Sequence, residues 1–134
     1  LQNIVSEMKA AGKGKKYDCL IGVSGGTDST YTLYLMKKMG LRPLAVHFDN
    51  GWNSEIAVHN IKNATNILDI DLYTLVADWE EFKDLQVAFL KSSTPDAEVP
   101  TDYAIISALL KVAAKEKIKY YSEWSKFRNF LFDR

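Results

Sequence analysis

Short apolar runs alternate along the chain with longer segments in which apolar residues recur at helical spacing. The runs are continuous enough for strands that are covered on both faces of a sheet. They occupy residues 17–23, 42–48, 71–76 and 118–121. The helical segments occupy residues 1–11, 30–39, 55–68, 78–90 and 101–113. This alternation predicts an α/β fold, with a doubly wound, mostly parallel sheet between two layers of helices.

A loop of small residues joins the first apolar run to the helical segment that follows it. It reads Val23-Ser24-Gly25-Gly26-Thr27-Asp28-Ser29. Successive glycines lack the Cβ atoms that would keep a ligand from the backbone, and several N–H groups converge there near the positive end of a helix. The pattern therefore predicts an anion site. The alternative is a tight turn in which Ser24 or Thr27 caps the helix and nothing binds.

Two familiar classes of glycine-rich phosphate loop do not fit this string. A Walker loop ends in Gly-Lys-Ser/Thr, whereas these glycines are followed by Thr-Asp-Ser. A dinucleotide fingerprint needs three glycines at a spacing that Gly22, Gly25 and Gly26 do not have. The string S-G-G-T-D-S instead resembles the PP-loop of the N-type ATP pyrophosphatases, which break ATP between the α- and β-phosphates. The resemblance implies an adenine nucleotide alpha hydrolase-like fold with three α/β/α layers.

The second apolar run also ends in polar residues, the string D-N-G-W-N-S at 49–54. Ligands of parallel α/β sheets bind at the carboxyl ends of the strands, so this string and the loop at 24–29 should face one pocket. We infer that adenosine lies across these ends and that the triphosphate lies on the loop. His47 precedes the pocket and is a candidate base, but a lone histidine in a strand is more often structural. We favour the structural interpretation.

Three further strings narrow the resemblance. They are V-H-F-D-N-G-W-N-S-E at 46–55, D-W-E-E-F-K-D-L-Q at 78–86 and P-T-D-Y-A-I at 100–105. Together they look like the N-acetyl sugar amidotransferases, PP-loop enzymes of lipopolysaccharide and other surface-polysaccharide biosynthesis. In that family ATP activates the acetamido oxygen of a nucleotide-linked sugar as an adenylate. Ammonia from a partner glutaminase subunit then displaces AMP.

The resemblance also implies roles for individual residues, with ATP and Mg²⁺ as the cofactors. Asp28 would hold the magnesium ion, Asp49 and Asn50 would contact the nucleoside or the sugar, and Asp28, Ser29 and Asp49 would be catalytic. The phosphates would be held by Ser24, Gly25, Gly26, Thr27, Asp28 and Ser29. Thr101 and Asp102 are weaker candidates, for which we favour an ordinary capped helix start. Trp52 and Trp79 either stack on a base or sugar or cover the core.

Composition adds limits to this picture. The length of 134 residues predicts one PP-loop domain over residues 1–134, with a lead-in helix within 1–16. Seventeen basic and seventeen acidic residues produce no overall field that would favour nucleic acid or a membrane surface. The single cysteine, Cys19, favours a reducing cytoplasm and is expected to be a small buried side chain. Because the first residue is Leu1, we expect the chain to be a segment of a longer protein.

Residues 121–134 form an atypical aromatic tail. Trp124, Phe127 and Leu131 either form one helical face that covers the edge of the sheet or leave an exposed patch that promotes homo-oligomers. The tail does not resemble the continuation of the amidotransferase family. We therefore expect this chain to bind nucleotide better than it turns it over.

Three functions are compatible with the sequence. The first is an ATP-dependent amidotransferase that acts on a nucleotide-linked sugar. The second is a PP-loop ligase of another branch, such as a tRNA-modifying thiolase or lysidine synthetase, although the chain has no second cysteine and no basic tract suited to RNA. The third is a nucleotide-binding module of the universal-stress kind, which has the same sheet and no turnover.

Overall fold

The structure is a computed structural model that describes residues 2–123 and 126–129. The strands and helices alternate as the apolar pattern predicts. In chain order they are α1 (Gln2–Ala11), β1 (Cys19–Gly22), α2 (Thr27–Lys38), β2 (Pro43–Asp49), α3 (Glu55–Leu68), β3 (Leu72–Val76), α4 (Trp79–Lys91), α5 (Val99–Lys115), β4 (Tyr120–Glu123) and β5 (Lys126–Asn129).

The strands form a five-stranded sheet in the order β3-β2-β1-β4-β5. Strand β1 pairs in parallel with β2 on one side and with β4 on the other, and β2 pairs in parallel with β3. The chain therefore builds outward from β1 in one direction and then crosses to its other side. Such a reversal leaves a crevice at the carboxyl ends of the central strands. The predicted doubly wound, mostly parallel sheet is confirmed.

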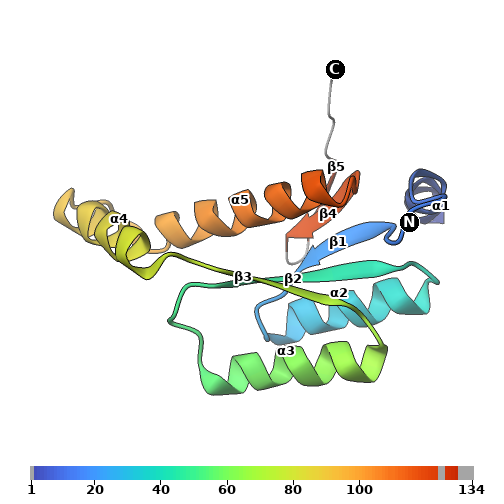
Figure 1. Ribbon diagram of the computed structural model, residues 1–134, viewed down its shortest axis with the longest axis horizontal. Coiled ribbons are helices and arrows are strands. Elements are labelled where there is room, and N and C mark those ends of the chain that lie inside the picture. The colour runs from blue at the N-terminus through green and yellow to red at the C-terminus, as the bar shows by residue number, and fades with distance from the viewer. Residues whose placement is uncertain (1, 124–125, 130–134) are drawn as a thin grey trace.

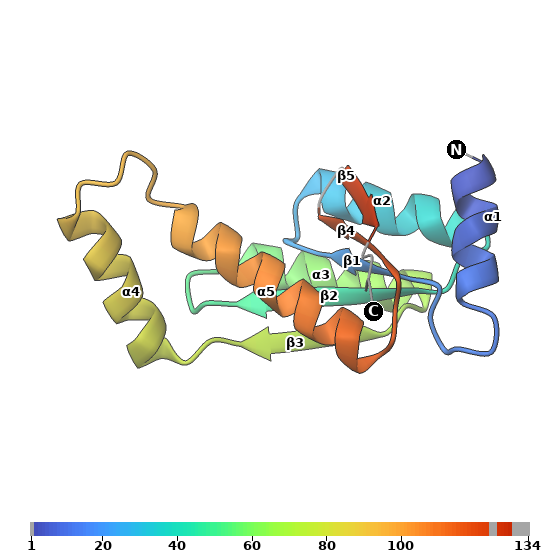
Figure 2. The ribbon, with the colours of Figure 1, turned by 90° about the horizontal axis from the view of Figure 1, so that it is seen from above.

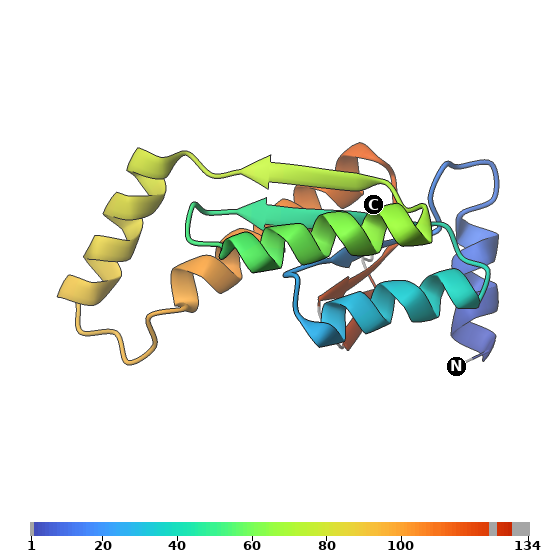
Figure 3. The same ribbon diagram turned by 90° about the horizontal axis from the view of Figure 1, so that it is seen from below.

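Helices cover both faces of this sheet, which confirms the three layers (Figure 1). Successive side chains of a strand point to opposite faces. Accordingly Ile21 packs in one core cluster with Leu33 of α2 and Ile61 of α3. Its neighbour Leu20 packs in the other cluster with Leu109 of α5. Figure 2 shows α4 beyond the arrowheads of β2 and β3 and α1 at the opposite end, and Figure 3 shows α2 and α3 side by side under the sheet.

The chain after β4 returns as an antiparallel strand. Strand β5 pairs with β4, and Tyr121 lies opposite Arg128. The alternative of one helical face through the tail is wrong at Phe127, because side chains of an extended strand repeat every two residues and not every 3.6. Trp124 and Leu131 lie outside the described residues. The proposed self-association through this tail stays a prediction.

Helix α5 begins earlier than expected. It starts at Val99 after Glu98, which makes no capping bond through its side chain, and Pro100 lies in its first turn. Proline suits this position because its fixed φ matches the helix and the first turn does not use its missing N–H group. The interpretation of Thr101 and Asp102 as a capped helix start is therefore wrong, and both residues lie inside the helix.

Cys19 is a free, fully buried thiol of β1. Burial, together with the nearby charge of Asp18, raises the pKa of this thiol to about 12. Since the thiolate is the reactive form, the side chain acts as a small apolar core residue. None of the helices in residues 2–123 combines the length and apolar character that crossing a membrane requires.

A buried carboxylate fixes the amino end of the sheet. Asp18 is only 4% exposed and accepts hydrogen bonds from the Arg42 backbone N–H at 2.8 Å and from Arg42 Nη2 at 2.6 Å. The same Nη2 donates to the carbonyl oxygen of Gly12 at 2.9 Å. Gly12 lies so close that a Cβ there would overlap Asp18 Oδ1 and come within 2.9 Å of Asp18 Cα.

Replacing Gly12 by alanine should therefore lower the free energy of unfolding by about 2–3 kcal/mol, because the added methyl displaces a buried, paired carboxylate. Urea denaturation measures the change. The matched control is Gly14→Ala, which meets no atom within 4 Å but has a φ of +78°. Strain at that φ should cost only about 1 kcal/mol. Equal losses in the two variants would contradict the packing of Gly12 on Asp18.

Candidate functional site

The predicted phosphate loop spans the end of β1 and the first turn of α2. Gly26 is the N-cap residue, and among the described residues no side chain caps this helix. The backbone N–H and the hydroxyl of Thr30 both bond to the carbonyl oxygen of Gly26, at 3.2 Å and 2.9 Å. The alternative in which Ser24 or Thr27 caps the helix is therefore wrong. The N–H groups of the first turn are left for a ligand, at the positive end of the helix dipole.

The two glycines of the loop differ in what they require. Gly25 has a φ of +81°, and a Cβ there would overlap the carbonyl oxygen of Ala57 in α3 and lie 2.7 Å from its Cα. Asn60 of α3 also donates to the Gly25 carbonyl oxygen at 3.2 Å. At Gly26 a Cβ would meet only Ser24 Oγ, at 3.5 Å. Gly25 thus docks the loop on α3, and Gly26 keeps its outer surface open.

Ser29 lies inside the loop. Its side chain is 2% exposed, and its hydroxyl donates to the Gly26 carbonyl oxygen at 3.2 Å. The Ser24 N–H in turn donates to Ser29 Oγ at 3.3 Å. The hydroxyl therefore connects the two ends of the loop and sets the direction of its N–H groups.

Asp28 lies on the outside of the same turn. It is exposed, and with Ser24, Gly26, Thr27 and Ser29 it lines an open depression of about 620 Å³. The described residues contain no cluster of three His, Cys, Asp or Glu side chains that could hold a metal by themselves. Magnesium typically takes one or two protein carboxylates and completes its shell with waters and substrate phosphates. The donors present therefore fit a magnesium ion that is bound together with phosphates.

The end of β2 forms a second polar loop. Asp49 Oδ1 accepts hydrogen bonds from the Gly51 N–H at 3.0 Å and from Asn53 Nδ2 at 3.2 Å. The bond from Gly51 is the main cause that lowers the pKa of Asp49 below its usual value. Asn50 is buried, and its Oδ1 accepts from the Trp52 N–H at 3.1 Å. The side-chain oxygens of Asp49 and Asn50 therefore both hold the conformation of the loop that follows β2.

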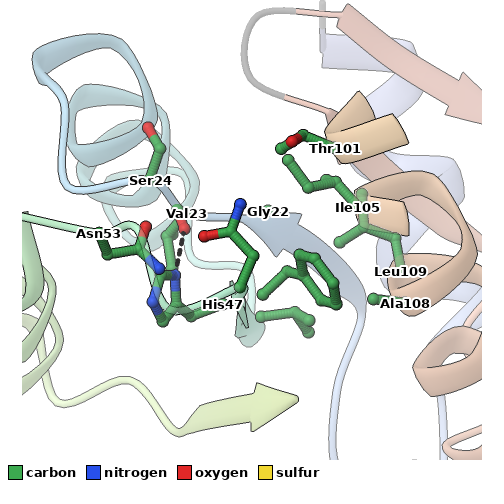
Figure 4. Close-up of a pocket in the computed structure, with 12 residues that line it drawn as sticks. Gly22, Val23, Ser24, His47, Asn53, Thr101, Ile105, Ala108 and Leu109 are labelled. Atoms are coloured by element: carbon green, nitrogen blue, oxygen red, sulfur yellow. Dashed lines mark hydrogen bonds between the residues drawn. The ribbon is translucent and has the colours of Figure 1, made fainter. Parts of the chain in front are cut away.

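A narrow cavity of about 60 Å³ joins these loops to α5. Ser24, His47 and Asn53 line one side, and Thr101 and Ile105 of α5 line the other (Figure 4). Asn50 belongs to the same lining, and Ser24 also lines the open depression over the phosphate loop. The structure thus brings Ser24, at the start of the loop, and Asn50 and Asn53, after β2, to one cavity. Asp28 and Ser29 line the separate open depression, and Asp49 lines neither of these two hollows.

Three residues that line this cavity, Asn53, Thr101 and His47, were not predicted from the sequence as main site residues. Asn53 belongs to the polar string at 49–54, in which no site role of its own was predicted for it; Ser54 caps α3 by accepting from the Ala57 N–H at 3.2 Å, and Asn53 lines the cavity. Thr101 was judged an ordinary helix start, although the string around it could have identified it. His47 is 5% exposed and places Nδ1 3.1 Å from the Val23 carbonyl oxygen. Its Nε2 is buried without a hydrogen-bond partner among the described residues.

An aromatic cluster borders the loop after β2. The rings of Trp52 and Trp79 meet edge-to-face at 5.9 Å, and Trp52 meets Phe82 of α4 at 5.7 Å. Phe82 is buried, whereas Trp52 is 52% and Trp79 44% exposed. The tryptophans therefore cover the core, as the structural interpretation expects, and also leave about half of each side chain exposed.

Curated relatives match about half of this chain. An uncharacterised protein of Methanocaldococcus jannaschii is 39% identical over 74 residues, which are 54% of this chain and 27% of that protein. A tRNA(Ile)-lysidine synthase of Chlamydia pneumoniae is 38% identical over 77 residues, which are 54% of this chain and 23% of that protein. The chain spans about a quarter of the length of these relatives.

Solved structures share the fold over most of the chain. The NH3-dependent NAD synthetase of Campylobacter jejuni matches with a TM-score of 0.63 and 16% identity, over 93% of this chain and 55% of that one. The glutamine-dependent NAD+ synthetase of Acinetobacter baumannii, solved with ADP, matches with a TM-score of 0.68 and 17% identity, over 90% of this chain and 24% of that one. These likenesses confirm the adenine nucleotide alpha hydrolase-like fold.

The family comparison covers residues 18–132, a range that includes the phosphate loop, the polar loop after β2 and all of α5. It confirms the PP-loop ATP pyrophosphatase type of domain. It does not confirm the narrower prediction that the chain is an N-acetyl sugar amidotransferase. By this match the chain belongs to the family described as queuosine biosynthesis protein QueC, within the PP-loop ATP pyrophosphatases.

Proposed function

We propose that this chain uses ATP to adenylate the acetamido oxygen of a nucleotide-linked N-acetyl sugar, so that ammonia can displace AMP. One observation carries the proposal. The three strings that resemble the amidotransferases are far apart in the sequence, and in the structure the first contacts the second and shares a cavity with the third. Asn53 of the first string and Thr101 of the third line one cavity, and Trp79 of the second contacts Trp52 of the first.

The chemistry requires a good leaving group on a poor electrophile. An amide carbonyl resists ammonia, but a phosphate ester on its oxygen departs readily as AMP. The free N–H groups of the phosphate loop and the positive end of α2 would bind the outer phosphates and stabilise the charge of the departing pyrophosphate. Asp28 and the phosphates would hold magnesium, which supplies further positive charge to the leaving group. Asp49 and Asn50 would position the nucleoside or the sugar.

The partners follow from the same reaction. We propose that a separate glutaminase subunit supplies ammonia, and that the nucleotide-linked sugar enters beside Trp52 and Trp79, whose exposed ring faces suit a sugar or a base. A cytoplasmic location agrees with the single free, buried thiol. Products of the sugar reaction would serve surface-polysaccharide synthesis.

Product analysis tests the proposal. The chain is incubated with MgATP, ammonium and a panel of UDP-N-acetyl sugars, with UDP-glucose as the control that lacks an acetamido group. The expected products are AMP and pyrophosphate, formed only with an acetamido sugar. Formation of ADP would contradict the assignment of the loop. Retention of nucleotide without products would favour the non-catalytic binding module.

A second candidate is a tRNA-modifying ligase. The description of the matching family and the tRNA(Ile)-lysidine synthase relative favour it. The loop would perform the same adenylation, with an oxygen of a nucleic acid base as the acceptor. The even balance of seventeen basic and seventeen acidic residues does not favour a polyanionic substrate. A tRNA transcript in the same assay discriminates, because AMP released with tRNA and not with the sugars would select this candidate.

A further inference from the structure

Strand β3 forms one edge of the sheet, and its outer side has no neighbouring strand among residues 2–123 and 126–129. Figures 2 and 3 show β3 as the outermost strand, beside β2. Its residues, Leu72–Val76, pair with β2 in an unbroken register, so the strand contains no bulge. Its outer side is therefore open along the whole strand.

The two edges of the sheet differ in their sequences. An open edge can pair with a strand of another chain, and natural proteins usually prevent this with charged residues, proline or a bulge. Strand β5, at the far edge, contains Lys126 and Arg128. Strand β3 reads Leu-Tyr-Thr-Leu-Val and has none of these protections. Thr74 is exposed and Val76 is 69% exposed, so this edge is a template for a further strand.

The hydrogen bonds to β2 show which backbone groups of β3 are available. The carbonyl oxygen of Asp71 accepts from the Ala45 N–H at 2.9 Å. The N–H of Ala77 donates to the Asp49 carbonyl oxygen at 2.8 Å. Successive residues of a strand direct these groups to opposite sides, so the odd-numbered residues from 71 to 77 face β2. The outward N–H and carbonyl groups belong to the residues between them, Leu72, Thr74 and Val76.

These outward groups determine how a second copy would pair. In an antiparallel ladder, two facing residues with outward groups exchange a pair of hydrogen bonds. A two-fold axis at Thr74 places this residue opposite itself and Leu72 opposite Val76, so every outward group of the strand is paired. A shift of the register in either direction would leave one of these residues outside the ladder.

The side chains are compatible with the same register. Thr74 meets its own copy at the axis, and threonine pairs across antiparallel strands are favourable. Tyr73, which packs with the core cluster under α5, lies opposite Leu75 of the second copy. The exposed side chain of Val76 lies opposite Leu72 and becomes covered. No charged residue occurs within the paired segment, so no like charges face each other there.

The charges beside β3 favour a second copy of this chain as the partner. The basic loop at residues 13–16 is held at the start of β3, because Lys16 Nζ lies 2.9 Å from Asp71 Oδ2. The end of β3 leads into the acidic start of α4, which contains Asp78 and Glu80. Antiparallel pairing brings the basic start of each strand to the acidic end of the other. The charges are therefore complementary at both ends of the ladder.

We propose that a second copy of this chain pairs with the free edge of β3, antiparallel about a two-fold axis at Thr74, so that one sheet runs through both copies. The same surface of each copy forms the contact, as in other two-fold dimers. The two phosphate loops then lie toward opposite ends of the shared sheet. The dimer is independent of the proposed function, because it uses no residue of the phosphate loop.

Size-exclusion chromatography with light scattering tests whether the dimer forms. The chain is measured up to roughly 100 µM, a concentration at which a dimer with a micromolar dissociation constant is populated. We expect a mass of about twice the 15.2 kDa of one chain, falling toward that of one chain on dilution. A mass of one chain at every concentration would overturn the inference.

Charge substitutions test the axis, because a residue on the axis faces its own copy. Thr74→Lys and Thr74→Glu should each weaken dimerisation by about tenfold or more, since each places two like charges together. Thr74 is exposed, so both variants should keep the circular dichroism spectrum of the parent. An equal mixture of the two should form dimers again, because lysine then faces glutamate. Thr74→Ser is the matched control and should dimerise like the parent.

Two results of this experiment would count against the proposal. If Thr74→Lys dimerises like the parent, the interface lies elsewhere, for example in residues 121–134, and the inference is overturned. If both charged variants are folded monomers and their mixture also stays monomeric, the axis at Thr74 is wrong.

Cysteine crosslinking tests the register directly. Facing residues of an antiparallel pair have Cα atoms about 5.5 Å apart, which is within the range of a disulfide. Thr74→Cys should therefore crosslink two copies under mild oxidation, and buried Cys19 should not compete. Val76→Cys alone should not crosslink, but it should do so when mixed with Leu72→Cys. Equal crosslinking of Val76→Cys and Thr74→Cys, each alone, would overturn the proposed register.

Discussion

Gly25→Ala is expected to lower the free energy of unfolding by about 2–4 kcal/mol and to abolish measurable binding of MgATP. Two effects add at this position. The φ of +81° strains any residue with a Cβ, which costs about 1 kcal/mol. The Cβ would also overlap the Ala57 carbonyl oxygen of α3, and relieving that overlap with backbone costs about 1–3 kcal/mol. Urea denaturation and isothermal titration calorimetry measure the two losses.

The matched control is the neighbouring substitution, Gly26→Ala. Gly26 has a φ of −81°, and its Cβ would meet only Ser24 Oγ at an ordinary contact distance, so the free energy of unfolding should fall by no more than about 1 kcal/mol, the preference for glycine over alanine at an N-cap. Because Gly26 lines the open depression, the new methyl should still weaken MgATP binding by roughly tenfold, since it keeps phosphate from the backbone. If Gly25→Ala is as stable as Gly26→Ala, the loop does not pack on α3 as the structure shows.

The layered fold could be predicted because its signals are local. The residues Cys19–Gly22 are all buried, and a strand covered on both faces leaves a continuous apolar run in the sequence. The S-G-G-T-D-S string is also contiguous, so its position between a strand and a helix followed directly. Strand β5 was missed because its pairing with β4 depends on contacts between residues and not on the apolar period of Lys126–Asn129 alone.

The roles within the site could be predicted less well, because they depend on contacts between distant segments. The difference between Gly25 and Gly26 arises from Ala57, which belongs to another helix. The orientation of the His47 ring likewise follows from the contact of its Nδ1 with the Val23 carbonyl oxygen, which joins β2 to the end of β1. The start of α5 was predicted wrongly for a different reason. Local capping rules favoured Thr101, but a proline in the first turn allowed the helix to begin at Val99.

Asp28→Ala is expected to weaken MgATP binding about 100-fold or more and to leave the fold intact. Asp28 is exposed in the first turn of α2, so its removal leaves no cavity in the core. Its loss from the helix dipole should cost only about 0.3–1 kcal/mol of stability. Glu81→Ala is the matched control, because Glu81 is an exposed acid in the first turn of α4 and should show the same small loss with unchanged MgATP binding.

Removing the metal should reverse the effect of Asp28→Ala on the affinity for ATP. With EDTA present, ATP brings four negative charges to a depression that already contains one carboxylate, and like charges at close range repel. Asp28→Ala should then bind ATP more tightly than the parent does, whereas with Mg²⁺ it should bind more weakly. A merely structural role of Asp28 would change both affinities in the same direction. Titrations with and without Mg²⁺ therefore decide whether this carboxylate acts through a metal, and equal MgATP affinity in the two proteins would show that it does not.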